Sequence, residues 1–292
     1  MSETRSRAIR LLAPLSGLLL FLQSALVVTG GAVRLTGSGL GCPTWPECTP
    51  GSYTPVPHQV QGQLHAWIEF GNRLLTFALF FAAVATVIAV FRSHRRDLRF
   101  LAITQILGIF AQGILGGITV LTNLNPLAVA SHFILSIFLI AAATSLHSRR
   151  KNPYVRTSSP HVQISRLSIF HLLLTFIVIV IGTLVTASGP HAGDINAPRL
   201  KLNIQHIAYI HGGLVAVLLI FTALFYISPG QRYETRRWIS IFFLLSLAQG
   251  AVGYIQYIKG VPELLVASHL LGSTLVWIAA WRIRLSVIRK LA

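Results

Sequence analysis

The sequence predicts an all-α integral membrane protein of eight transmembrane helices, arranged as two parallel-repeat four-helix bundles. One observation is composition, because the 292 residues are 53% hydrophobic and only 11% charged, unlike a soluble globular domain. A second is an internal repeat, in which Ala-Gln-Gly followed by Ala-Ser-His occurs twice. Gln112 corresponds to Gln249 and His132 to His269, both 137 positions apart. The third is an alternating distribution of basic residues along the chain.

Eight segments are long enough to span a bilayer, which takes roughly 20 mostly apolar residues. The first segment resembles a signal peptide, but it is long, has no convincing cleavage site and has a counterpart in the repeat, so we expect it to be a helix. The approximate limits of the expected helices are 9–31, 68–91, 98–121, 127–147, 165–187, 206–227, 238–258 and 263–284.

The net charge of +17 follows the positive-inside pattern of membrane proteins. Four alternate connections hold only Arg34, Arg199, Lys201 and Lys259. We therefore expect cytoplasmic N and C termini and attraction to anionic membrane lipids, with no binding of nucleic acid. The other basic clusters flank the expected cytoplasmic ends: Arg5, Arg7, Arg10, Arg92, Arg95, Arg96, Arg99, Arg149, Arg150, Lys151, Arg156, Arg166, Arg232, Arg236, Arg237, Arg282, Arg284, Arg289 and Lys290.

The chain divides into an N-terminal unit, residues 1–150, and a C-terminal unit, residues 151–292. Lys151-Asn152-Pro153 and Ser158-Ser159-Pro160 interrupt the apolar pattern between them. Each unit has an even number of helices, so both enter the membrane from the same side, related by a pseudo-twofold axis along the membrane normal. The long loops 32–67 and 188–205 occupy equivalent positions and are expected outside the cytoplasm.

Small residues around Gln112 and Gln249 predict close packing of the third and seventh helices. The two glutamines either form hydrogen bonds across helices or contact a ligand. The even-numbered helices also carry equivalent polar positions. Alignment of the second helix with the sixth places Asn72 opposite His211, so the four positions are Asn72, His132, His211 and His269.

The C-terminal unit has two histidines, His211 and His269, at similar depth. Facing inward, they could bind one haem iron from both sides, because imidazole is a common iron ligand and bundle cofactor sites use side chains of facing helices. The alternative is a pair of hydrogen-bonded core histidines. Polar groups at membrane depth are costly and are usually functional, which favours the haem.

The N-terminal unit keeps His132 but has Asn72 in place of a second histidine. Glu69 is one turn before Asn72 and shares its helix face. A buried carboxylate suits proton transfer, although Glu69 could instead pair with Arg73 or Arg34. His65, two turns before Asn72, is a weaker candidate to replace the missing histidine.

The two cysteines, Cys42 and Cys48, lie in the first outer loop, where such a pair predicts a disulfide bond. The disulfide could be a structural clamp or a redox-active pair that handles electrons.

With these residues the chain resembles the haem A synthase family of the bacterial CtaA type. The most specific signal is the run from Thr29 through Gly30, Gly31, Arg34 and Leu40 into Cys42-Pro43-x-Trp45-Pro46. The resemblance implies that His211 and His269 bind haem b and that His132 receives the iron of the substrate, haem O. Two departures are visible. The family motif Glu-x-x-His-Arg reads Glu69-Phe70-Gly71-Asn72-Arg73, and the loop 188–205 lacks a second cysteine pair.

The resemblance further implies an oxidoreductase that converts one methyl group of haem O to a formyl group by successive hydroxylations, making haem A for cytochrome c oxidase. Glu69 would handle a proton near that methyl group. Haem b would relay electrons to an acceptor that the sequence does not identify. Expected partners are membrane lipids and haem O synthase or oxidase assembly factors. The expected location is the bacterial plasma membrane, with the haem sites toward its outer face.

Two other classes of protein remain as alternatives. A b-type membrane cytochrome that only passes electrons would carry paired histidines in both units, which Asn72 and Glu69 argue against. A transporter built from parallel repeats would have broken helices at the midplane, and these segments lack central prolines.

Overall fold

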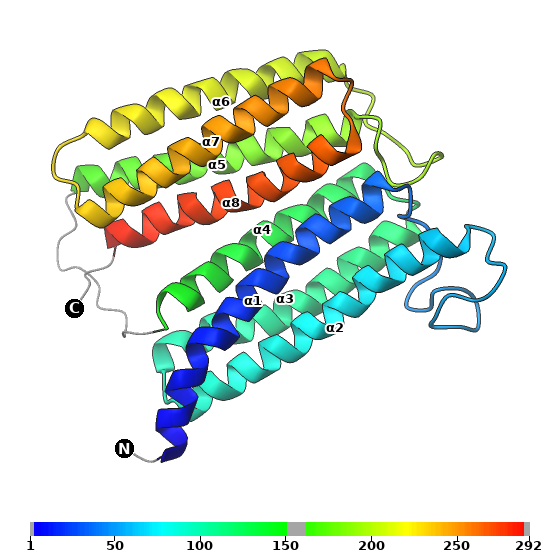
Figure 1. Cartoon of the computed structure of the whole chain (residues 1–292), viewed down its shortest axis with the longest axis horizontal. Helices are drawn as coiled ribbons and strands as arrows, with labels where there is room; N and C mark the ends of the chain where they lie inside the picture. The colour runs from blue at the N-terminus through cyan, green and yellow to red at the C-terminus, as the bar shows by residue number, and fades with distance from the viewer. Residues whose placement is uncertain (1–2, 151–161, 289–292) are drawn as a thin grey trace. The chain divides into compact units, whose positions relative to one another are not determined.

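The computed structural model describes residues 3–150 and 162–288, which form eight α-helices (Figure 1). Each of these helices is long and apolar enough to cross a membrane. The predicted all-α, multi-pass membrane protein is therefore confirmed. The helices are α1 (Glu3–Leu35), α2 (Gln63–Arg92), α3 (Arg96–Leu121), α4 (Pro126–Ser148), α5 (Val162–Ser188), α6 (Ile204–Ile227), α7 (Tyr233–Ile258) and α8 (Glu263–Ile288).

Each predicted segment corresponds to one helix, but several helices are longer than their apolar windows. The largest differences are at α1, which begins at Glu3 and continues to Leu35, and at the starts of α2 and α7. Backbone hydrogen bonding continues into polar turns that hydropathy does not score as membrane-spanning. The predicted boundary between the two units, at residue 150, adjoins the segment 151–161, which lies outside the described residues. Four of the basic residues used to predict the topology also lie outside them: Lys151, Arg156, Arg289 and Lys290.

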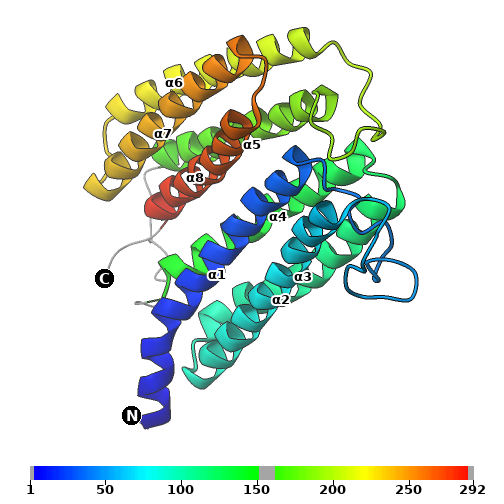
Figure 2. The same ribbon diagram turned by 45° about the vertical axis from the view of Figure 1, so that its right-hand side comes forward.

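The chain forms two compact units, of which unit 1 contains α1–α4. In unit 1, α1 packs against α2 and α4, and α3 packs against the same two helices (Figure 2). A buried amide pair crosses this bundle, because Gln23 Nε2 donates to Gln105 Oε1 at 2.9 Å. Gln105 Nε2 donates in turn to the carbonyl of Leu139 at 3.1 Å. These bonds connect α1, α3 and α4 in the apolar interior.

Unit 1 also includes residues 186–202, the segment that ends α5 and follows it. Gly39 N donates to Gly193 O at 2.8 Å, which joins this segment to the loop after α1. That loop, residues 36–62, lies at the end of unit 1 where α1 ends and α2 begins (Figures 1 and 2). We call this the loop end of unit 1.

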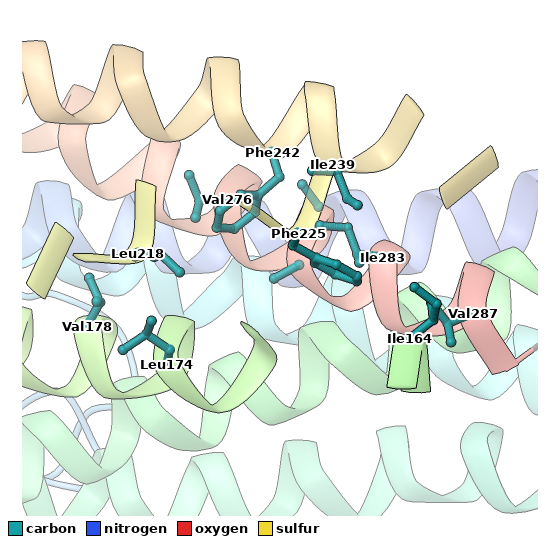
Figure 3. Close-up of a cluster of buried hydrophobic side chains, with 12 residues drawn as sticks. Ile164, Leu174, Val178, Leu218, Phe225, Ile239, Phe242, Val276, Ile283 and Val287 are labelled. Atoms are coloured by element: carbon teal, nitrogen blue, oxygen red, sulfur yellow. The ribbon is translucent and has the colours of Figure 1, made fainter. Parts of the chain in front are cut away.

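Unit 2 contains α6–α8 and α5 as far as Val185, and the side chains of these four helices share one apolar core (Figure 3). Phe225 of α6 and Phe242 of α7 are its largest buried members. His171 of α5 is fully buried beside them, with its ring 4.4 Å from that of Phe242 and Nε2 3.1 Å from Thr222 Oγ1. The partnered imidazole therefore belongs to the structural core of unit 2.

Truncation of Phe242 tests the importance of this core. We expect Phe242→Ala to lower the free energy of unfolding by about 3 kcal/mol, because removal of a buried aromatic ring leaves a cavity. Leu244→Ala on the same helix is the control, since Leu244 is 64% exposed. Thermal unfolding in detergent measures both, and equal midpoints for the two variants would contradict the packing described.

Candidate functional site

Two histidines of unit 2 face each other between α6 and α8. The ring centroids of His211 and His269 are 6.4 Å apart, with the ring planes at 70°. Two imidazoles that bind one metal from opposite sides, through bonds of about 2.0–2.1 Å, have ring centres roughly 6–6.5 Å apart. The spacing thus fits two axial ligands on a single iron.

Each of these two rings lies against a glycine of a neighbouring helix. A Cβ added to Gly182 of α5 would lie 3.1 Å from Cε1 of His211. One added to Gly253 of α7 would lie 3.2 Å from Cε1 of His269. Both separations are tighter than ordinary van der Waals contact, so the absence of a side chain lets each ring lie against the helix backbone. From the sequence alone, Gly253 is predicted only to contribute to close packing of the seventh helix.

The two corresponding positions of unit 1 lie against glycines as well. A Cβ on Gly116 of α3 would lie 3.2 Å from Cε1 of His132. A Cβ on Gly30 of α1 would lie 4.0 Å from Nδ2 of Asn72. Asn72 has a further partner, because Thr29 Oγ1 donates to its Oδ1 at 2.7 Å. The amide is thereby fixed against α1.

The two repeat-related glutamines make different contacts. Gln112 Nε2 donates to Ser136 Oγ at 2.7 Å and to the carbonyl of His132 at 3.2 Å. Gln112 therefore forms the cross-helix bond that the sequence offered as one alternative. Gln249 packs against Gly272 of α8, where a Cβ would meet its amide at 1.6 Å. Both glutamines support the helix that carries a histidine.

Glu69, near the start of α2, is buried, with 7% of its surface exposed. Its Oε2 accepts a hydrogen bond from the backbone N–H of Cys42 at 2.7 Å. Its Oε1 accepts from Arg73 Nη2 at 2.6 Å and from Arg73 Nε at 3.2 Å. Arg73 is thus the ion-pair partner of Glu69, whereas Arg34 donates to the carbonyls of Thr186 and His191.

Arg73 also holds the loop that contains the cysteines. Its Nη2 donates to the carbonyls of Cys42 and Thr44 at 3.0 and 3.1 Å. Its Nη1 donates to the carbonyl of Glu47 at 3.1 Å. One guanidinium therefore connects the carboxylate of Glu69 with several backbone carbonyls of the loop.

The structure contains the predicted disulfide between Cys42 and Cys48, and neither cysteine is exposed. Cys42 lies against the first turns of α2, with Sγ 3.9 Å from the carbonyl oxygen of Ala66. Gly41 allows this approach, because a Cβ there would lie 2.3 Å from the carbonyl oxygen of His65. His65 itself is hydrogen-bonded to Ser38, with Nδ1 and Oγ 2.9 Å apart. It lies about 10 Å along α2 from the level of Asn72.

The loop also places Trp45 against α3. A Cβ on Gly117 would lie 2.7 Å from Cδ2 of the Trp45 indole. Gly117 directly follows Gly116, the glycine that receives His132. Trp45 is 42% exposed. The disulfide loop therefore reaches the helical turn beside His132.

Comparison with known proteins gives the family. The model of the COX15-CtaA family, described as "Cytochrome oxidase assembly protein", matches residues 14–193. This range is more than half of the chain. The chain belongs to the COX15-CtaA family.

Three relatives named "Heme A synthase" show how far the similarity extends within the COX15-CtaA family. The Geobacillus thermodenitrificans protein is 33% identical over 141 residues, which are 45% of this chain and 42% of its own length. The Geobacillus kaustophilus protein is 32% identical over 108 residues, 36% of this chain and 32% of its own. The chain thus spans less than half the length of these two relatives. The Lysinibacillus sphaericus protein is 25% identical over 262 residues, 84% of this chain and 83% of its own.

Sequence reasoning missed two features of this COX15-CtaA chain. The hydrogen bond from Thr29 to Asn72 could have been anticipated, because Thr29 begins the stretch of sequence that most specifically carries the family resemblance. The inclusion of residues 186–202 in unit 1 had no such signal, since the segment follows α5 and uses the backbone carbonyls of Thr186, His191 and Gly193 to accept hydrogen bonds from the rest of unit 1.

Loss of the Arg73 guanidinium should loosen the disulfide loop. We expect Arg73→Gln to accelerate reduction of the disulfide by a water-soluble thiol about tenfold or more, because hydrogen bonds to charged groups contribute about 1.5–3 kcal/mol. Arg92→Gln, at the other end of α2, is the control. Thiol labelling over time measures the rate, and equal rates in the two variants would show that Arg73 does not hold the loop.

Proposed function

We propose that this chain is a haem A synthase, an oxidoreductase that converts a methyl group of haem O to a formyl group. One observation carries the proposal: the two units present unequal sites. Unit 2 has two facing imidazoles, whereas unit 1 has one imidazole, an amide and a buried carboxylate one turn away. The names of the relatives support the same activity.

In unit 2, His211 and His269 would hold haem b as its two axial ligands. The centroid spacing of 6.4 Å and the glycines behind both rings support this assignment. Haem b held in this way supplies one-electron transfer. Gly182 and Gly253 keep each ring against its neighbouring helix, so both imidazoles are oriented before a haem binds.

In unit 1, His132 would bind the iron of the substrate, haem O. The carbonyl of His132 accepts from Gln112, which fixes the turn of α4 that carries the ring. Asn72 is held by Thr29, and an amide is a poor ligand for haem iron. A porphyrin with one protein ligand is released more readily than one with two, which suits a substrate that must leave as product.

Glu69 is the group we propose to accept a proton from the reacting side of haem O. It is one turn before Asn72, and residues three apart share a helix face. Its carboxylate is buried and paired with Arg73. With water as the source of the formyl oxygen, oxidation of a methyl to a formyl group releases protons as well as electrons. The electrons pass to the acceptor, and a base inside an apolar bundle can receive the protons. The buried disulfide would clamp the loop around this carboxylate, since buried cysteines are generally inert.

The proposed setting is the plasma membrane of a bacterium, with parallel four-helix repeats, cytoplasmic termini and both haem sites toward the outer face. The basic clusters support these termini. Asn72, His132, His211 and His269 all lie in the first three turns of their helices, which supports sites at one common depth. The electron acceptor and any contact with haem O synthase or oxidase assembly factors belong to the same proposal.

Haem analysis of cells tests the proposed activity. Expression of the chain in a bacterium that makes haem O but not haem A should produce haem A, separated by chromatography of extracted haems. Continued accumulation of haem O alone, with the protein present in the membrane, would reject the activity. A b-type cytochrome predicts that second result, but it would also need paired imidazoles in both units.

Matched glycine substitutions test the haem b site. Gly253→Leu should displace the His269 ring and remove most of the low-spin haem b absorbance of the purified protein. Gly250→Leu, one turn earlier on α7, should retain it, because no heavy atom lies within 4 Å of a Cβ at that position. Equal haem content in the two variants would contradict the ligand assignment.

Substitution of Glu69 tests the proposed base. We expect Glu69→Gln to keep haem b and to lower haem A formation about 100-fold or more, since a positioned general base contributes about 10²–10⁴-fold. Arg73→Gln is the control, because it releases the loop and leaves the carboxylate. Equal losses in the two variants would show that Glu69 acts only as an anchor of the loop.

A further inference from the structure

Two arginines at the loop end of unit 1 have no acidic partner among the residues that the structure describes. Arg34 is partly buried at the end of α1, and Arg199 lies in the segment 186–202 that docks onto the same unit. Both arginines donate hydrogen bonds to backbone carbonyls of residues 186–191, so the two side chains reach the same short stretch of chain. Neither arginine forms an ion pair with a carboxylate among the described residues, in contrast to Arg73, whose partner is Glu69.

Backbone carbonyls fix both guanidinium groups. Arg34 Nη2 donates to the carbonyl of Thr186 at 2.7 Å, and its Nε donates to the carbonyl of His191. Arg199 Nη1 donates to the carbonyl of Gly189. Nη1 of Arg34 has no hydrogen-bond partner in the described part of the chain, so its two N–H donors remain available.

The position of Arg34 relates it to the candidate substrate site. Arg34 is four residues after Gly30 and therefore lies on the same face of α1, one turn nearer the loop end. That face meets Asn72, through the hydrogen bond from Thr29 and a van der Waals contact at Gly30. Arg34 is thus one helical turn, about 5 Å, beyond the level of Asn72.

Two neighbouring, partly buried cations repel each other, and an anion between them relieves this repulsion. Guanidinium groups bind oxyanions through paired N–H donors. We propose that Arg34 and Arg199 together bind an oxyanion at the loop end of unit 1, and that this anion is a propionate of the porphyrin substrate. This inference rests on the proposed function, because it names how haem O is held. A phosphate of an anionic lipid shares the same chemistry and is distinguished below.

The test compares haem O with its dimethyl ester, in which both propionates are uncharged. Each is titrated into the full-length protein with haem b already bound, in nanodiscs of neutral lipid, and the ratio of the two dissociation constants is measured. We expect the unchanged protein to prefer the free acid about tenfold or more, the typical effect of a charge-assisted hydrogen bond. The double variant Arg34→Gln, Arg199→Gln should bind both forms equally.

Lys201→Gln is the matched control, because it removes one positive charge from the same segment but leaves the arginine pair. It should retain the preference for the acid. Arg34 also holds the segment 186–202, so Arg199→Gln alone provides a second variant and should lose a large part of the preference. A double variant that keeps the full preference, or an unchanged protein that shows none, would overturn the subsite.

Nanodiscs of phosphatidylglycerol separate the lipid source from the porphyrin source. If the arginines bind lipid phosphate, the double variant will lose affinity for phosphatidylglycerol while its acid-to-ester ratio stays that of the unchanged protein, and the propionate assignment is then wrong. Haem A formation by the unchanged protein is measured separately. Its absence would reject the proposed activity, whereas the acid-to-ester ratio reports on the subsite alone.

Discussion

The absence of a Cβ at three glycines determines where the histidine rings of the even-numbered helices lie. Gly116, Gly182 and Gly253 each leave room for a histidine ring against a helix backbone, whereas Asn72 is held by the hydrogen bond from Thr29. An imidazole among apolar helices needs both space and orientation, and these glycines provide the space. The two units therefore share equivalent polar positions on their even-numbered helices, and they differ in which side chain occupies each position.

At the loop end of unit 1, the ion pair between Glu69 and Arg73 fixes the position of a buried polar side chain. It joins a buried carboxylate, a disulfide loop and the backbone N–H of Cys42 in one network. Such a network limits the movement of the carboxylate, because a change in the loop alters its hydrogen bonds. The loop in turn carries Trp45 to the helical turn beside His132. The proposed base, the clamp and the wall of the substrate site are thus parts of a single arrangement.

The sequence predicted the eight helices and the disulfide, because hydropathy is a local signal and the chain has only two cysteines. Internal repetition indicated the four equivalent polar positions, because corresponding residues of the two halves can be aligned. The sequence left open which arginine pairs with Glu69, since spacing alone allowed Arg73 or Arg34. It assigned residues 188–205 to an outer loop but not to unit 1. Backbone-to-backbone contacts such as Gly39 with Gly193 leave no pattern in side-chain chemistry, so only the folded chain reveals them.

The central claim is that unit 2 holds haem iron through two imidazoles, whereas unit 1 holds it through His132 alone. Electron paramagnetic resonance of the ferric protein, purified with haem b and loaded with haem O, tests this most directly. The account predicts one low-spin and one high-spin signal, and conversion of the high-spin signal to low-spin in Asn72→His. Low-spin signals from both haems of the unchanged protein would contradict it.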